Sequence, residues 1–133
     1  MPRTFTILLA LLAVIALPAA PAGALDLNGY RAAAHRRPLQ YNGALAAMAS
    51  RHAHDLARRN HLDHDGFRES RVSGGARAEN VSYGCGDESC AIRQWSRSGG
   101  HRANMLRADV SGYGLASAIS AGGRRYWVLI LGH

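Results

Sequence analysis

The stretch "SGYGLASAISAGGRRYWVLIL", residues 111–131, decides the fold class because its pattern differs from that of the chain before it. Tyr113, Leu115 and Ser117 alternate with small residues, as is typical of a strand with one buried face. "SAGGRR" supplies turn residues, and "YWVLIL" is a short apolar run that fits a buried strand. The stretch therefore predicts a closing pair of strands.

Two helices are predicted upstream of these strands. The first covers residues 25–37 and ends before Pro38. The second covers "GALAAMASRHAHDLARRN", residues 43–60, with Asn42 as its N-cap and Asn60 as a left-handed residue at its end. Its apolar face repeats at steps of three and four residues, through Leu45, Met48, His52 and Leu56.

The middle of the chain is less regular. Residues 61–80 are rich in Gly, Asp and Ser, and a loop of that length in a small domain usually carries function. "VSYG" predicts a short strand, Asp87 caps a helix through "ESCAIRQWSRS", and "GGHRANML" predicts a turn that leads into further helix. Helices first and a hairpin last indicate an α+β fold, with helices packed on a small antiparallel sheet.

The N-terminal segment "MPRTFTILLALLAVIALPAAPAGA", residues 1–24, has the pattern of a secretory signal peptide. The alternative is a membrane anchor, but the apolar run is shorter than the ~20 residues that a spanning helix needs. Removing 24 of the 133 residues leaves 109, enough for one domain over residues 25–133. We expect a secreted or periplasmic protein that is not integral to a membrane.

Two cysteines, Cys85 and Cys90, lie in the exported part. In an oxidising compartment they predict one disulfide that closes a small loop. A redox or metal pair is the alternative, although four residues separate the cysteines where redox pairs usually have two.

All sixteen basic side chains are arginine, against nine acidic ones, which gives a net charge of +7. Such a charge attracts anionic surfaces. The arginines are scattered singly or in pairs without interleaved aromatic residues, so the pattern indicates solubility and loose adhesion rather than specific nucleic-acid binding.

Seven histidines invite a metal hypothesis. His61 and His64 are three residues apart, between carboxylates, and share a face only if their segment is helical. His101 follows two glycines at a helix start, where the dipole disfavours a protonated ring. It is a candidate metal ligand, a catalytic base or a packed histidine. Glu79 stands between a polar loop and an apolar strand, where a site is often lined.

Four motifs occur in order along nearly the whole exported chain. They are the segment from "LNGYRAAAHRR" to "RRNHLDH", then "AENV", then "WSRSGGHRANML", and last "YGLASA" with "RRYWVLILG". Together they resemble the CAP superfamily, which comprises cysteine-rich secretory, antigen 5 and pathogenesis-related 1 proteins, and in particular its bacterial SCP-like members.

The resemblance implies a single CAP domain folded as an α/β/α sandwich, with a central cleft lined by two histidines and acidic residues. His64 and His101 match the histidines, which in some members hold zinc or another divalent cation, and Glu79 matches the glutamate of the "GEN" signature. Ser98 and Asn80 are expected beside them. Ser98 stands where eukaryotic members carry a second glutamate, so one negative charge that would neutralise an ion is missing.

Two main functions follow as hypotheses. One is an extracellular, monomeric binding module for a lipid, sterol or cell-envelope ligand. The other is a metal-assisted, peptidase-like hydrolase, with an ion on His64 and His101 and Glu79 as the catalytic base. A basic nuclease using "HLDHDG" is a third and weaker hypothesis.

Overall fold

The structure is a computed structural model that describes residues 25–133, so the predicted signal peptide at residues 1–24 lies outside the described residues. The sheet is built from β1 (Gln40–Tyr41), β2 (Ala76–Tyr83), β3 (Gly112–Ile119) and β4 (Arg125–Gly132). The helices are α1 (Leu27–Ala33), α2 (Gly43–Arg59), α3 (Glu88–Ser96) and α4 (Gly99–Met105), with a short π-helix, η1 (Phe67–Arg71).

Helix α1 is shorter than the sequence predicts. It begins after Asp26, whose side chain accepts a hydrogen bond from the backbone N–H of Gly29, and it ends at Ala33 instead of Arg37. His35 adopts a left-handed conformation, with φ of 56°, which a continuing right-handed helix does not allow. The chain therefore turns well before Pro38, the residue expected to stop the helix.

Both predicted caps of α2 are confirmed. The side chain of Asn42 accepts a hydrogen bond from the N–H of Leu45 at 3.0 Å, and Asn60 is left-handed with φ of 50°. The face of α2 that carries the predicted apolar repeat is buried against the sheet. The cap of α3 by Asp87 is confirmed as well, because its carboxylate accepts from the N–H of Cys90 at 2.8 Å.

Strand β2 is longer than the predicted "VSYG" and begins at Ala76, inside the segment expected to be a loop. Glu79 therefore lies within a strand and not at its start. The sheet order is β1-β3-β4-β2, with β3 and β2 antiparallel to β4 and the short β1 parallel to β3. The expected antiparallel sheet is thus extended by one parallel edge pair.

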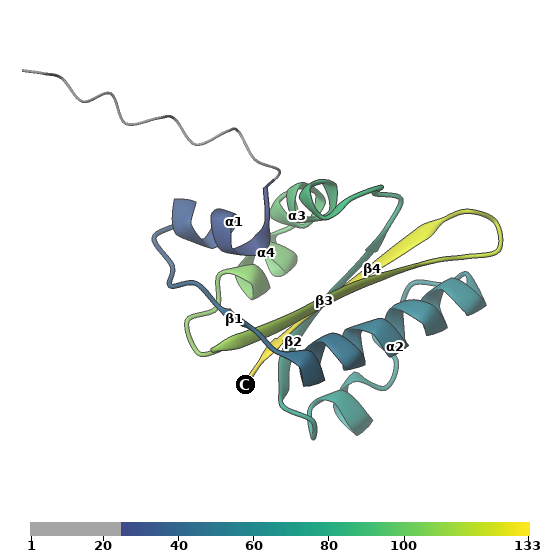
Figure 1. Cartoon of the computed structure of the whole chain (residues 1–133), viewed down its shortest axis with the longest axis horizontal. Coiled ribbons are helices and arrows are strands. Elements are labelled where there is room, and N and C mark those ends of the chain that lie inside the picture. The colour runs from purple at the N-terminus through teal and green to yellow at the C-terminus, as the bar shows by residue number, and fades with distance from the viewer. Residues whose placement is uncertain (1–24) are drawn as a thin grey trace, which may run out of the picture.

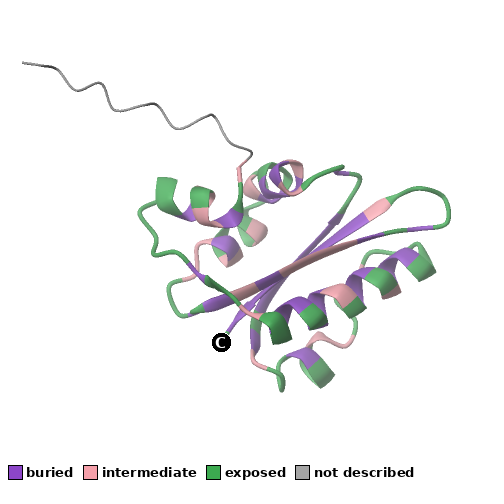
Figure 2. Ribbon diagram, viewed as in Figure 1, coloured by how far each residue is buried: buried purple, intermediate pink, exposed green. Residues whose placement is uncertain are grey.

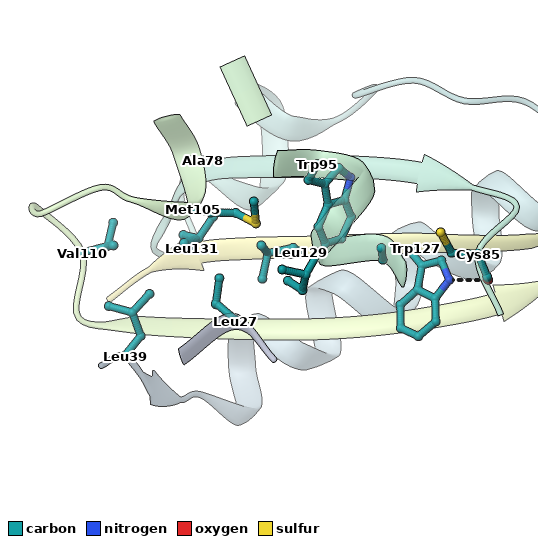
Figure 3. Packing of buried hydrophobic residues seen from close by; sticks show 12 residues of the cluster. Leu27, Leu39, Ala78, Cys85, Trp95, Met105, Val110, Trp127, Leu129 and Leu131 are labelled. Carbon is teal, nitrogen blue, oxygen red and sulfur yellow. Dashed lines mark hydrogen bonds between the residues drawn. The ribbon is translucent and has the colours of Figure 1, made fainter. Parts of the chain in front are cut away.

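The helices cover the sheet on both sides, as expected for an α/β/α sandwich. Figure 1 shows α2 and η1 on one face and α1, α3 and α4 on the other. The buried residues of Figure 2 form two clusters, one against each face. Trp95, Met105 and Leu129 belong to the cluster drawn in Figure 3. No helix within residues 25–133 is long and apolar enough to cross a membrane.

Strand β4 forms the centre of both clusters. Leu129 and Leu131 pack toward α1, α3 and α4, while Val128 and Ile130 pack toward α2. Alternate side chains of a strand point to opposite faces, so a continuous apolar run is what a strand covered on both sides requires. The prediction of a buried strand at "YWVLIL" is confirmed.

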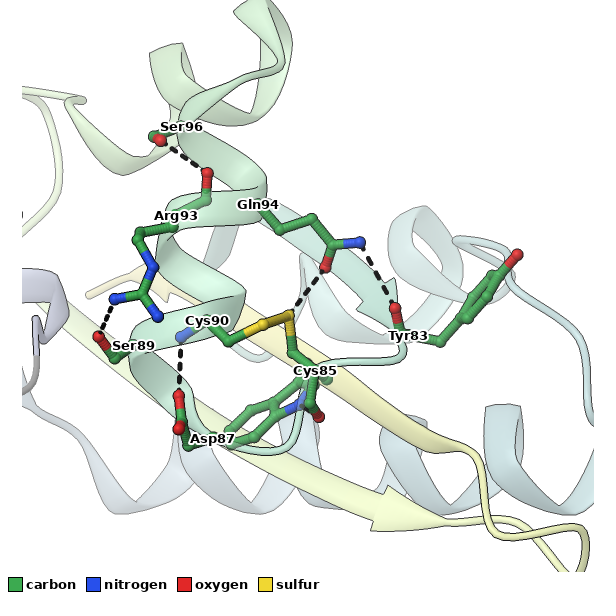
Figure 4. The surroundings of a disulfide bond; sticks show 9 residues. Tyr83, Cys85, Asp87, Ser89, Cys90, Arg93, Gln94 and Ser96 are labelled. Carbon is green, nitrogen blue, oxygen red and sulfur yellow. Dashed lines mark hydrogen bonds between the residues drawn. A yellow bond between two sulfur atoms is a disulfide. The ribbon is translucent and has the colours of Figure 1, made fainter.

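The predicted disulfide between Cys85 and Cys90 is present, and it joins the end of β2 to the first turn of α3 (Figure 4). The carbonyl of Cys85 also accepts a hydrogen bond from Nε1 of Trp127 at 2.8 Å. The loop is short, so the cross-link stabilises by about 2–3 kcal/mol in the loop-entropy model. Its structural role is to hold α3 against the end of β2.

Candidate functional site

The site forms around β2, which lies at the edge of the sheet. Ala78 of β2 packs with the cluster beneath α3 and α4, whereas Val81 packs with the cluster beneath α2. Glu79 has the same parity as Val81 and so points toward α2 and η1, while Asn80 and Ser82 point toward α3 and α4. One strand thus supplies groups to both sides of the sheet edge.

Glu79 is buried, and its charge is neutralised inside the protein by Arg71. Nη2 of Arg71 donates to Oε1 of Glu79 at 2.9 Å, and its Nε lies 2.6 Å from Oε2. Two further hydrogen bonds hold the guanidinium in place, because it also donates to the carbonyls of Asp65 and His64 at 2.9 and 3.2 Å. The buried carboxylate thus forms a charge-assisted pair with a guanidinium that the chain holds in place.

Two histidines reach the same carboxylate. Nδ1 of His64 lies 2.9 Å from Oε1 of Glu79, and Nε2 of His52 lies 3.5 Å from it. The hydrogen bond to Glu79 raises the pKa of His64 above its ordinary value, against a smaller opposing effect of burial. His52 is buried and its ring also contacts the carbonyl oxygen of Asp63 at 3.0 Å. The packing role expected for His52 therefore includes a place beside Glu79.

The side chains of His61 and Asp63 lie outside the ionic cluster around Glu79. His61 is exposed, and its Nε2 lies 3.9 Å from the carboxylate of Asp63. That carboxylate is bound by Arg59 at 2.7 Å. The segment is irregular rather than helical, so His61 and His64 do not form the ligand pair that a helical turn would make.

His101 lies on α4, on the other side of β2. Its backbone carbonyl accepts a hydrogen bond from Nδ2 of Asn80 at 3.0 Å, and Oδ1 of Asn80 accepts one from Asn104 at 2.9 Å. Burial lowers the pKa of His101, and the nearby charge of His64 lowers it further. Through these two hydrogen bonds Asn80 holds α4 against β2, so it is a positioning residue.

A cleft of about 390 Å³ opens beside His101, between β2 and α3. Two buried polar atoms belong to residues of its wall and have no hydrogen-bond partner within residues 25–133: Oγ of Ser82 and Nε1 of Trp95. Glu79 and His64 are not part of the wall, so the cleft lies next to the ionic cluster and not around it. The lining residues are Leu62, Val81, Ser82, Tyr83, Gln94, Trp95, Ser98 and His101.

The donor set is incomplete for a zinc site. Within the described part of the chain, no three His, Cys, Asp or Glu side chains are arranged to hold one ion. Arg71 occupies the carboxylate of Glu79, which leaves the imidazoles of His64 and His101 where catalytic zinc usually has three protein ligands. Metal binding by this pair stays a prediction, which zinc titration of the wild type and of His101→Ala would test through their melting temperatures.

The residues that sequence reasoning missed are Arg71 and the link of His52 to Glu79. His52 stood on the apolar face of its predicted helix, and that was a signal of burial. Arg71 gave no such signal, because it is one of many scattered arginines in a polar segment. Only the fold of the segment around η1 brings it to Glu79.

The model of the CAP family, described as the cysteine-rich secretory protein family, matches residues 26–131. The chain belongs to this family. No curated protein sequence matches it. The CAP family membership agrees with the order of the four motifs and with the sandwich of helices around the sheet.

Solved structures of bacterial proteins share the CAP fold of this chain. An outer surface protein of Borrelia burgdorferi superposes with a TM-score of 0.65 at 16% identity, over 80% of this chain and 85% of that one. An extracellular SCP-domain protein of Bacillus anthracis gives 0.57 at 23% identity, over 78% of this chain and 37% of that one. A cysteine-rich secretory protein of Staphylococcus aureus gives 0.58 at 18%, over 78% and 35%. The chain thus spans little more than a third of the latter two proteins.

Proposed function

We propose that this CAP-domain protein is an exported binding module whose cleft beside His101 holds a small amphipathic ligand. The observation that carries the proposal is a pair of buried polar atoms of wall residues, Oγ of Ser82 and Nε1 of Trp95, that find no partner in the described part of the chain. A buried donor without an acceptor costs about 1–3 kcal/mol. A ligand that satisfies these groups recovers that energy.

The lining indicates the chemistry of the ligand. The indole N–H of Trp95 only donates, so the ligand has to present an acceptor such as a hydroxyl, carbonyl or carboxylate oxygen. Leu62, Val81 and Tyr83 form an apolar wall that suits a hydrocarbon body. A lipid, a sterol or an amphipathic cell-envelope component has both parts.

Export is part of the proposal. The N-terminal sequence has the pattern of a signal peptide, and the disulfide suits an oxidising compartment. The Borrelia, Bacillus and Staphylococcus proteins are described as surface, extracellular and secretory proteins, which agrees with this location.

A metal-assisted hydrolase has less support in the geometry. Such an enzyme needs Glu79 as a base for a bound water. Both carboxylate oxygens of Glu79 face Arg71, and Oε1 also lies 2.9 Å from Nδ1 of His64. These contacts occupy both of the oxygens with which Glu79 would have to bind and deprotonate a water.

The proposal is tested by titrating the protein with lauric acid and with cholesterol. Trp95→Phe keeps most of the ring packing but removes the N–H donor, so affinity for the bound compound should fall about five- to tenfold. Trp127→Phe is the matched control, because its Nε1 binds the carbonyl of Cys85 and Trp127 is not part of the cleft wall. Equal affinities in the two variants, or no binding of either compound to the wild type, would contradict the proposal.

A further inference from the structure

A second cavity, of about 540 Å³, lies between the segment after α1 and the segment between α4 and β3. It shares no lining residue with the cleft beside His101. Three of its lining residues are arginines and one is a histidine, and none is acidic. The lining is Arg31, His35, Arg36, Arg37, Pro38, Leu39, Gln40, Ala108, Val110 and Ser111.

The left-handed turn after α1 brings these cations together. His35 has φ of 56°, and the N–H of Arg36 donates to the carbonyl of Arg31 at 2.9 Å, which closes the turn. The chain is thereby folded back over the end of α1. His35, Arg36 and Arg37 then line the same cavity as Arg31, one helical turn earlier in the sequence.

Arg31 is buried, with 2% of its surface exposed, and its partners among residues 25–133 are all carbonyl oxygens. Its Nε donates to the carbonyl of Arg37 at 2.9 Å, and its Nη1 donates to those of Met105 and Arg107 at 2.7 and 2.9 Å. No residue between 25 and 133 offers it a carboxylate, and its Nη2 has no hydrogen bond there. The charge of this guanidinium is therefore not paired with a carboxylate of the described residues, and its Nη2 group is free to donate.

Four other arginines contact a carboxylate, which Arg31 does not do within the described residues. Arg59, Arg71 and Arg107 each form an ion pair, as does Arg58. Asp109 is the nearest acidic residue along the chain to the cavity wall, but Arg107 holds its carboxylate at 2.6 Å. Burial lowers the pKa of Arg31, and the charges of Arg36 and Arg37 lower it further, so the three cations repel one another.

We propose that this cavity binds a phosphate group. A phosphate carries one to two negative charges and several acceptor oxygens, which matches the free edge of Arg31 and the two flexible side chains of Arg36 and Arg37. Pro38, Leu39 and Val110 add an apolar wall for the carbon chain of a phosphate ester. Lipid headgroups and free phosphates share this chemistry, and the site is independent of the cleft.

The test is an NMR titration of the protein with inorganic phosphate, together with co-sedimentation on phosphatidylglycerol vesicles. Phosphate should shift the backbone signals of residues 31–39 in a saturable way. In Arg36→Ala/Arg37→Ala the affinity for phosphate should fall at least tenfold. The carbonyl of Arg37 that binds Arg31 is kept in this variant, so the fold is retained.

Arg68→Ala/Arg97→Ala is the matched control, because it removes the same charge from exposed positions elsewhere. It should bind phosphate like the wild type. If the cavity variant also loses vesicle binding, the source is a lipid headgroup; if it loses phosphate binding alone, the source is a free phosphate or phosphate ester. Equal losses in the two double variants, or no shift within residues 31–39, would overturn the proposal.

Discussion

The carboxylate of Glu79 organises the ionic cluster of this CAP domain. It lies within 3.5 Å of side-chain nitrogens of Arg71, His64 and His52, which come from three separate segments. Removing one partner of a buried ion pair leaves an uncompensated charge and typically costs about 3–5 kcal/mol. Arg71 and Glu79 therefore stabilise the folded structure of the site, whether or not they take part in a reaction.

The pair formed by His64 and Glu79 predicts a pH dependence of stability. The folded protein raises the pKa of His64, so protonated His64 favours the folded state. This contribution is fully present below the pKa of the unfolded chain, about 6.5, and is lost as the pH rises through the higher folded value. The ring is half exposed, so solvent reduces the effect.

Urea unfolding of the wild type and of His64→Gln measures this effect. The stability advantage of the wild type should be larger at pH 6 than at pH 8.5. His61→Gln removes an exposed imidazole from the same segment and serves as the control. If the stability advantage of the wild type over His64→Gln grows with pH, Glu79 does not favour the protonated form of His64.

At the scale of elements, Gly114 of β3 sets how closely α2 approaches the sheet. A Cβ at this position would collide with the backbone of Leu45 and Ala46. Because these are main-chain atoms of a helix, they cannot move aside as a flexible side chain does. The contact explains why a glycine stands inside this strand.

Gly114→Ala should therefore destabilise the protein by about 1–3 kcal/mol or more, since α2 has to shift away from β3. Gly43→Ala is the matched control, because a Cβ there meets nothing within 4 Å. Thermal unfolding of both variants measures the difference. A Gly114→Ala protein as stable as Gly43→Ala would mean that the helix is packed less tightly on the sheet.

Local signals in the sequence predicted the elements but not how they combine. The caps at Asn42, Asn60 and Asp87 and the strand at "YWVLIL" were predicted correctly because each depends on neighbouring residues. The predicted end of α1 and the predicted length of β2 were wrong. The turn at His35 places a residue other than glycine in a left-handed conformation, which no local signal indicated, and the pairing of β2 with β4 depends on a distant part of the chain.

The residues of the candidate site divide in the same way, into those that a sequence motif indicates and those that depend on the fold. His64, Glu79 and His101 were predicted from motifs that the chain shares with the CAP family. Arg71 had no motif, since its role depends on the conformation of the segment around η1. That Nε1 of Trp95 has no acceptor among residues 25–133 could not be predicted either, because an indole that packs in a core usually also finds an acceptor.

At the scale of the whole molecule, two cavities differ in the chemistry of their lining residues. The cleft beside His101 combines an apolar wall with two residues whose buried polar atoms have no partner in the part of the chain described, and the cavity at Arg31 is lined by three arginines. Under the two proposals, one molecule would hold an amphipathic ligand in the first cavity and a phosphate group in the second.

The most direct test of the binding proposal uses the two indole N–H signals of the wild-type protein in a ¹H–¹⁵N NMR spectrum. Nε1 of Trp95, a residue of the cleft wall, has no hydrogen-bond partner within residues 25–133, whereas Nε1 of Trp127 donates to the carbonyl of Cys85. On addition of lauric acid or cholesterol, the Trp95 signal should move downfield and the Trp127 signal should stay in place. If the Trp95 signal stays fixed while either compound binds, the cleft is not the binding site.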